Sequence, residues 1–288
     1  MALLPVSVSS KTTSRKLSSL AQAAIVYHDI FDYPLTEGEL IKWEVARRVV
    51  RGRQFAKKII FKNGFYFITG RDGLILKRLV RERNSSNKLI IARKVGNILQ
   101  VVPGIKGVFI TGALAMESAD ESSDIDLMIV TQKGLLWTTR LLAFLILRLF
   151  GIPLRKPGQV EQKDKLCLNM WLDEGSLAWP KKKRNLFSAH EIAQVIPIVN
   201  KEQIYERFLF SNRWLKKYWP NTVRIIKVPR LKTKRISLLV PVETLARWMQ
   251  YLYMKRKMTN EVVTPHKAVF HPNDLEGIVL TRLRGYFV

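Results

Sequence analysis

The stretch FITGALAMESADESSDIDLMIV (residues 109–130) carries the clearest structural pattern in the chain. A short apolar run turns at Gly112, passes through a helix-prone segment and ends in a second apolar run. Five acidic residues fall within ten positions just before and at the start of that second run. With a further apolar run at 164–172, the alternation of strand and helix predicts an α/β sheet domain.

Asp124 and Asp126 stand at the start of the second predicted strand, DIDLMIVT (124–131). Because side chains alternate along a strand, both carboxylates are expected on one face, with Ile125 on the other. Two hard oxygen ligands on one face suit Mg²⁺, which binds carboxylates, water and substrate phosphates. We therefore predict that Asp124 and Asp126 bind metal; the alternative is a strand cap beside a solvated surface acid.

Gly112 lies between the first predicted strand and the helix-prone ALAMESA (113–119). A glycine lets the backbone approach a phosphate closely, and the first amides of a following helix can bind it. Thr111, Gly112 and Ala113 are therefore predicted to bind the phosphates of a nucleotide, with Ser123 nearby. A tight turn without a ligand is the alternative. Phosphate-binding amides beside a carboxylate pair suit metal-assisted nucleotidyl transfer.

The segment TGALAMESADESSDIDLMIV resembles the signature of the DNA polymerase beta-like nucleotidyltransferases. That signature is a strand, Gly-Ser or Gly-Gly, a short helix, and Asp-x-Asp at the start of the next strand. Ten residues separate Ala113 from Asp124, inside the family's usual spacing. The resemblance covers roughly residues 105–175, and it implies a mixed sheet with helices, two Mg²⁺ ions and a nucleoside triphosphate substrate.

The sequence departs from that signature at two positions. Ala113 stands where the family usually has Ser or Gly, so a hydroxyl contact is lost. In the third predicted strand, Asn169 stands where the family carries a third carboxylate that binds metal and acts as the base. Asp173 is on the same face but about 13 Å further along a strand. Asn169 is kept as a site residue in place of that carboxylate, and an inactive domain is the alternative.

The flanking regions suggest five segments. Thr36 followed by Glu39 is a capping-box pattern, and Asn63-Gly64 predicts a β-hairpin. Three helices and a hairpin predict a small winged-helix-like domain. The order of this start, which includes YHDIFDYPLTEGEL (27–40), the core and a helical tail resembles uncharacterised bacterial and archaeal proteins that carry a nucleotidyltransferase domain. The segments are a flexible leader (1–15), the winged-helix-like domain (16–70), a helical connector with a polar break at 84–87 (71–104), the nucleotidyltransferase core (105–180) and a basic helical region (187–288).

The composition points to an anionic partner. The chain of 288 residues carries 49 Lys and Arg against 23 Asp and Glu, a formal net charge of +26, which attracts nucleic acid, nucleotide phosphates or anionic lipid. A single cysteine, Cys167, rules out an internal disulfide and fits a reducing cytosol. The sequence has no P-loop, no dinucleotide-binding glycine motif and no nucleophile elbow. A zinc-protease helix at His190 also fails, because Gln194 replaces the second histidine.

Two helical segments have alternative interpretations. Residues 135–152 are the best membrane candidate, but Arg140 and Arg148 interrupt them, so a buried amphipathic helix is expected. Ser188 followed by Glu191 predicts a second capping box. In the C-terminal region Trp214, Tyr218, Trp248 and Tyr251 are expected as core anchors, although aromatic residues interleaved with basic ones also suit stacking on nucleic acid.

The sequence alone thus predicts a cytoplasmic, Mg²⁺-dependent nucleotidyltransferase with an unidentified acceptor. The alternative is a nucleic-acid-binding protein that combines a winged helix with a catalytically degenerate nucleotidyltransferase-like domain.

Overall fold

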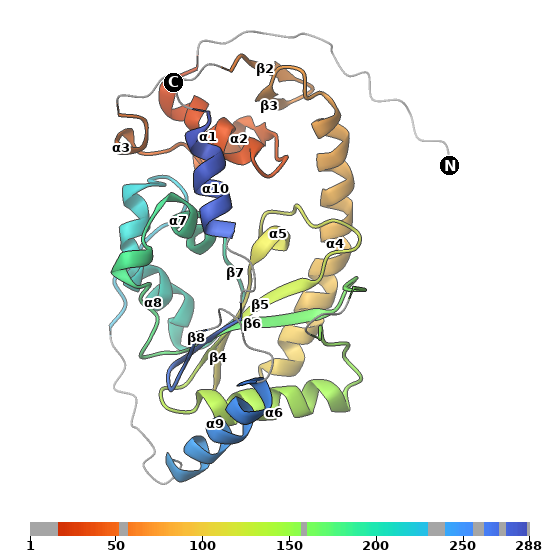
Figure 1. Ribbon diagram of the computed structural model, residues 1–288, viewed down its shortest axis with the longest axis vertical. Helices are drawn as coiled ribbons and strands as arrows, with labels where there is room; N and C mark the ends of the chain where they lie inside the picture. The colour runs from red at the N-terminus through yellow and green to blue at the C-terminus, as the bar shows by residue number, and fades with distance from the viewer. Residues whose placement is uncertain are drawn as a thin grey trace.

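The computed structural model describes residues 17–51, 57–156, 160–229, 240–255, 262–270 and 275–286. The fold is mixed α/β: helices surround a six-stranded sheet, and a separate three-stranded sheet lies near the N-terminal helices (Figure 1). The predicted leader, residues 1–15, lies outside the described residues.

The six-stranded sheet is mixed, as the resemblance implies. Its order is β7-β4-β5-β6-β9-β8, with β5 and β6 parallel and every other neighbouring pair antiparallel. The central strands are almost wholly buried because helices cover both faces, which explains their long apolar runs. The strands are β4 (Ile105–Ile110), β5 (Ile125–Thr131), β6 (Leu166–Asp173), β7 (Ile196–Asn200), β8 (Val262–Thr264) and β9 (Lys267–Val269).

The expectation that residues 187–288 are helical is wrong in part, because this region supplies three of the six strands. The short apolar run of β7 pairs with β4, and the β8–β9 hairpin pairs with β6. Runs of three to five residues are too short for periodicity to separate strand from helix. The helices of the region are α7 (Leu186–Ala193), α8 (Ile204–Ser211), α9 (Val240–Lys255) and α10 (Leu275–Arg284), with short 3-10 turns at 201–203 and 213–217.

The N-terminal region contains three helices and a hairpin in the predicted order. The predicted capping box is confirmed: the Thr36 hydroxyl accepts from the Glu39 amide, and the Glu39 carboxylate accepts from the Thr36 amide. The hairpin is confirmed as well, with Asn63 and Gly64 both at positive φ. The elements are α1 (Ser19–Asp29), β1 (Leu35–Thr36), α2 (Glu37–Lys42), α3 (Arg47–Val50), β2 (Ile59–Lys62) and β3 (Phe65–Ile68), in the sheet order β1-β3-β2.

This region packs tightly on α7. His190 of α7 stacks on Trp43 with ring centroids 4.2 Å apart, and its Nε2 lies 3.2 Å from Nε2 of His28. Burial lowers the pKa of both histidines, that of His190 to about 3, so both rings are neutral. The predicted Ser188–Glu191 capping box is wrong: α7 begins at Leu186, and Asn185 forms the box with Ser188.

Helix α4 (Gly73–Leu99) runs without the predicted break at 84–87. Within this polar stretch Ser85 is buried against the loop between α5 (Gly112–Ala115) and β5, whereas Ser86 and Asn87 are exposed. The Ser85 hydroxyl accepts a hydrogen bond from the amide of Ala119, and Lys88, about one turn further along α4, donates to the carbonyl of Ser123 in the same loop. A polar stretch inside this helix therefore marks a contact with the site and not an interruption.

Helix α6 (Leu136–Leu149) is the helix expected at 135–152, but it is only partly buried, because Leu145 and Leu149 on its outer side are exposed. The carboxylate of Glu243 on α9 accepts hydrogen bonds from the amides of Trp137 and Thr138, which caps the N-terminus of α6. Arg148 is exposed, as expected, whereas Arg140 lies under α9 and bonds Gln250. None of the described helices has both the length and the apolar character needed to cross a bilayer.

Candidate metal and nucleotide site

Asp124 and Asp126 lie together at the start of β5, as predicted. One ligand atom each from Asp124, Asp126 and Cys167 lies within 4.8 Å of the other two, so the three side chains could hold a metal ion. Cys167 comes from β6, where it pairs with Asp126 in the parallel register. The sequence placed the two aspartates on one face but did not place Cys167 beside them.

Gly112 brings the backbone against this acidic group. Its φ is +63°, and a Cβ built on it would lie 2.7 Å from Oδ2 of Asp126, closer than a side chain can approach. The turn is held in register because the amide of Thr111 donates to the carbonyl of Asp126 at 3.1 Å. A side chain at position 112 would therefore force the Asp126 carboxylate to shift, and the two parts of the predicted motif are in direct contact.

The surroundings of Asp126 disfavour its charged form. Burial first, and then the charge of Asp124, raise the pKa of Asp126 from 3.8 to about 7. Burial, Asp126 and Asp124 together raise the pKa of the Cys167 thiol, which therefore stays protonated. A protonated thiol is no ligand for a hard cation, so the oxygens of the aspartates remain the suitable ligands.

Asn169 also faces this group. A register shift between Asp126 and Met128 gives β6 one extra residue, and the amide Nδ2 of Asn169 donates to Oδ1 of Asp126 at 2.7 Å. Its amide oxygen Oδ1 is buried and has no hydrogen-bond partner in the described part of the chain. An unpaired buried oxygen beside two carboxylates is a further possible ligand for a cation.

Asp173 lies outside the metal-ligand cluster, as its predicted distance along the strand implies, and it bonds other residues. Its buried carboxylate bonds Nδ1 of His266 at 2.6 Å and accepts from the amides of Gly134 and Gly175. These contacts hold the turn between β8 and β9 to the end of β6. They leave Asp124 and Asp126 as the carboxylates of the metal-ligand cluster among the described residues.

Arg155 neutralises part of the site. Its guanidinium Nη1 lies 2.7 Å from Oδ2 of Asp124 and 3.7 Å from Sγ of Cys167. It follows α6 in the chain, and its amide is fixed by the carbonyl of Leu166 on β6. No motif in the sequence marked this arginine, because its role depends on the loop after α6 returning to β6.

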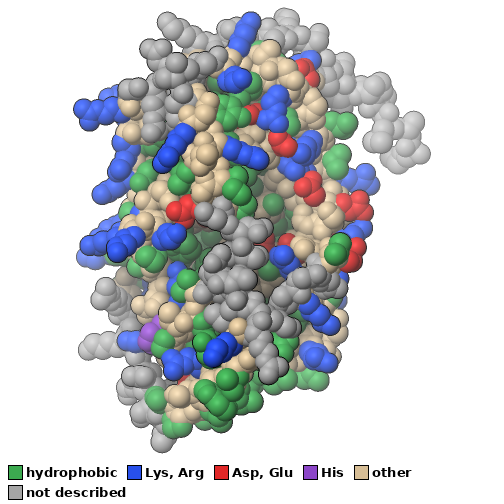
Figure 2. Space-filling view, in the orientation of Figure 1, with side chains coloured by type: hydrophobic (Ala, Val, Ile, Leu, Met, Phe, Trp, Pro, Cys, Tyr) green, Lys and Arg blue, Asp and Glu red, His purple; other side chains and the backbone are tan. Residues whose placement is uncertain are grey.

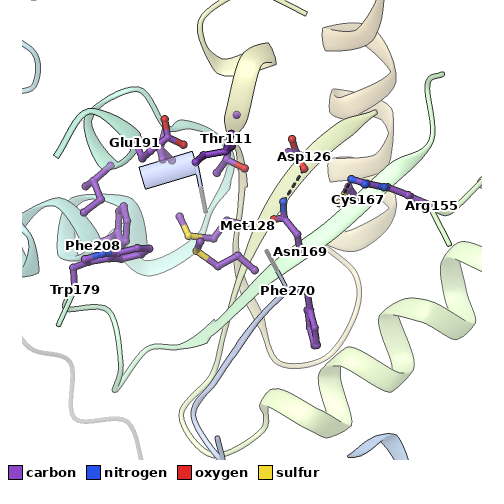
Figure 3. A pocket seen from close by; sticks show the side chains of 15 residues that line it. Thr111, Asp126, Met128, Arg155, Cys167, Asn169, Trp179, Glu191, Phe208 and Phe270 are labelled. Atoms are coloured by element: carbon purple, nitrogen blue, oxygen red, sulfur yellow. Dashed lines mark hydrogen bonds between the residues drawn. The ribbon is translucent and has the colours of Figure 1, made fainter. Parts of the chain in front are cut away.

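A cavity of about 210 Å³ opens beside the acidic group (Figure 3). Thr111, Gly112, Asp126, Arg155 and Asn169 line its polar side. Glu191 of α7 also lines the cavity, and its carboxylate accepts from Gln194 at 2.9 Å. The apolar wall comes from strands and helices distant in sequence and includes Met128, Met170, Trp179, Phe208 and Phe270.

The structure thus brings together most of the predicted site residues. Asp124, Ala113 and Ser123 are not among the described residues that line the cavity, although Asp124 belongs to the ligand cluster beside it. The Ser123 hydroxyl donates to the carbonyl of Asp120, and its own carbonyl accepts from Lys88. No motif in the sequence predicted that Arg155 or Glu191 belongs to this site.

Lys88 anchors the loop that delivers Asp124. Its ammonium is only 2% exposed and donates to the carbonyls of Glu121 and Ser123 and to Oδ1 of Asp164, at 3.0, 2.8 and 2.6 Å. These bonds fix the backbone immediately before the acidic pair. A lysine on α4 therefore sets where Asp124 lies.

Replacing Lys88 with methionine is expected to lower the free energy of unfolding by about 2 kcal/mol, because buried acceptors lose a charged donor. Urea unfolding checks this. Lys62→Met is the control, because Lys62 pairs with Asp72 at an exposed position and its loss should cost less than about 0.5 kcal/mol. Equal effects of the two substitutions would contradict the anchoring role.

The pKa of Asp126 predicts a pH dependence. The Asp126 carboxyl releases its proton near pH 7 in the folded chain but near pH 3.8 in the unfolded chain. Between these two pH values the folded state therefore binds more protons than the unfolded state. The free energy of unfolding should therefore fall as pH rises from about 4 to about 7. Urea unfolding of wild type and Asp126→Asn across this pH range measures the difference between their free energies of unfolding. A difference that does not change with pH contradicts the assignment.

The residues present fit a hard divalent cation. The oxygen of Asn169 lacks a hydrogen-bond partner among the described residues, burial and the charge of Asp124 raise the pKa of Asp126, and the available oxygen ligands suit Mg²⁺.

Comparison with known proteins adds little. No protein-family model matches the sequence, and no curated protein is significantly similar to it. A solved structure described as "Crystal structure of the toxin-antitoxin with AMP-PNP" is 13% identical to this chain. The likeness covers 45% of this chain and 88% of that chain, with a TM-score of 0.25, which is too low to support an argument about fold or function.

Proposed function

We propose that the chain is a Mg²⁺-dependent nucleotidyltransferase that takes a nucleoside triphosphate and passes the nucleotidyl group to a hydroxyl acceptor. One observation carries the proposal: the Gly112 turn lies directly against the Asp126 carboxylate, which shares a ligand cluster with Asp124. A backbone that can approach phosphate and a carboxylate pair that can bind metal thus meet at one point.

In this proposal each residue has a distinct role. Asp124 and Asp126 hold the metal, with the Asn169 amide oxygen as a third ligand. Metal ions bound there would neutralise the triphosphate and lower the pKa of the attacking hydroxyl. Asn169 also orients Asp126 through its Nδ2, but an amide cannot take a proton. Arg155 already lies 2.7 Å from Asp124, where phosphate oxygens would compete for its guanidinium.

The turn and the cavity would position the substrate. The backbone from Thr111 to Ala113 would face the β and γ phosphates, with Ser123 nearby. The apolar wall would exclude water from the α phosphorus, where the acceptor attacks in line with the departing pyrophosphate. The volume of about 210 Å³ is below the roughly 300–1,000 Å³ typical of drug-sized ligands, so a nucleotide would extend beyond the cavity.

A second candidate function is nucleic-acid binding by a winged-helix-like region joined to an inactive domain. It is favoured by Asn169, because the described residues place no third carboxylate in the metal-ligand cluster. The formal net charge of +26 also favours it. Such binding would weaken steeply with salt, because each neutralised phosphate releases counterions.

The decisive assay incubates the protein with each of the four nucleoside triphosphates, labelled at the α phosphate, with Mg²⁺ and separate pools of RNA, DNA and protein acceptors. The proposal predicts transfer of label with at least one triphosphate, abolished by EDTA. Absence of transfer, together with salt-sensitive binding of nucleic acid in a filter assay, would select the second candidate.

A further inference from the structure

Helix α9 has its apolar face outside. Val242, Leu245, Trp248, Met249 and Leu252 follow helical spacing along one side, and all five are exposed. Trp248 is 58% exposed, although the sequence predicts it as a core anchor, and Tyr251 is exposed too. The predicted anchor Trp214, in contrast, is buried in the core.

The opposite side of α9 is attached to the protein by polar contacts. Besides the Glu243 cap on α6, Gln250 donates to the carbonyl of Trp137 and accepts from Arg140, at 2.7 and 2.6 Å. Ala246 and Met254 are buried on this same side and form its apolar part. Most surface helices bury their apolar side and expose their polar side. Because α9 does the reverse, its exposed apolar side indicates an interaction surface.

The neighbouring helix α6 extends this surface. Leu141, Leu145 and Leu149 recur every four residues on its outer side and are exposed. Figure 2 shows hydrophobic side chains gathered over the end of the molecule where Figure 1 places α6 and α9. We call the exposed apolar residues of these two helices the α6–α9 face.

The charges beside this face select the kind of partner. The two helices, both wholly described, carry Arg148, Arg247 and Lys255 outside the contact between them, whereas Arg140 is half-buried under α9; their single acid, Glu243, is engaged in the cap. Basic side chains beside Trp and Leu complement anionic lipid headgroups over an apolar layer. Nucleic acid offers no apolar layer, and a second copy of the chain would bring another formal +26 against the first.

We propose that the α6–α9 face is a peripheral docking surface for an anionic membrane. The face lies flat on the lipid surface, with Leu245, Trp248 and Leu252 entering the headgroup boundary and the nearby cations pairing with lipid phosphates. This binding is independent of the nucleotide site.

The test is co-sedimentation of the full chain with vesicles of phosphatidylcholine alone or mixed with phosphatidylserine. Binding is expected with the mixed vesicles. Leu245→Glu/Leu252→Glu should weaken it by about tenfold or more, because charged side chains must then enter the apolar boundary. The matched control is Leu76→Glu/Ile90→Glu, which changes charge equally at two exposed apolar positions of α4, 69% and 68% exposed, and should reduce binding much less.

Fluorescence gives a second readout. Trp248 is the most exposed of the seven tryptophans, so a blue shift on adding mixed vesicles should report its insertion and vanish in Trp248→Phe. Circular dichroism confirms that the variants fold. No binding by wild type, or equal losses in the two double variants, would overturn the proposal. Self-association in sedimentation that Leu245→Glu/Leu252→Glu abolishes would assign the face to a second copy instead.

Discussion

Transfer of a nucleotidyl group is expected to fall by on the order of 10³ or more when Asp124 and Asp126 are both replaced by asparagine, because metal-bound charge stabilisation contributes several kcal/mol. Asparagine keeps the shape of each side chain, and at position 126 it still offers an oxygen to Asn169. The substitution therefore removes charge while it preserves packing. Initial rates of label transfer with the preferred triphosphate measure the effect.

Asp120→Asn/Glu121→Gln is the matched control for this prediction. It removes the same charge from the same loop, but Asp120 pairs with Arg81 and Glu121 with Lys163, away from the ligand cluster. Its rate should stay within about threefold of wild type, the effect of a weak surface pair. Comparable losses in both double variants would mean that the loop, and not the metal-ligand pair, supports the activity.

Replacing Gly112 with alanine is expected to reduce transfer by about 10²-fold, the effect of displacing a catalytic group by about 1 Å. The new Cβ would sit 2.7 Å from Oδ2 of Asp126, so the carboxylate must leave its present position in the ligand cluster. The positive φ adds about 1–2 kcal/mol of destabilisation. Rates and urea unfolding, measured together, separate the two effects.

A substitution at Gly151 is the control that separates the effect of the Cβ contact with Asp126 from the effect of backbone strain. Its φ is +64°, against +63° for Gly112, and an added Cβ there meets nothing within 4 Å. Gly151→Ala should therefore lose similar stability from the backbone alone but retain its transfer rate. If Gly112→Ala also retains its rate, the close approach of the turn to Asp126 has no catalytic role.

Local patterns predicted the elements that need only neighbours in the sequence. The capping box at Thr36, the turn at Asn63-Gly64 and the alternation that sets Asp124 and Asp126 on one face each depend on a few adjacent residues. The structure has all three. The turn at Gly112 was also predicted from the sequence, because its positive φ and the short helix after it depend on adjacent residues.

Features that depend on distant pairing were missed. The β7 strand forms because β4 offers an edge, and the β8–β9 hairpin because β6 does, and neither edge is visible in a local window. Arg155 and Glu191 reach the cavity from loops and helices whose placement depends on that same sheet. The exposure of Trp248 could not be foreseen either, since helical spacing fixes which residues share a face but not which face is covered.

The proposed activity requires a cation-dependent nucleotide site at Asp124, Asp126 and Gly112. Thermal unfolding with Mg²⁺ and each nucleoside triphosphate tests it most directly, because a ligand that binds only the folded chain stabilises it by about 2.7 kcal/mol at 100 times its Kd. We predict a higher Tm with Mg²⁺ and at least one triphosphate together, lost with EDTA and in Asp124→Asn/Asp126→Asn. An unchanged Tm with all four triphosphates, or an equal rise in the double variant, would contradict it.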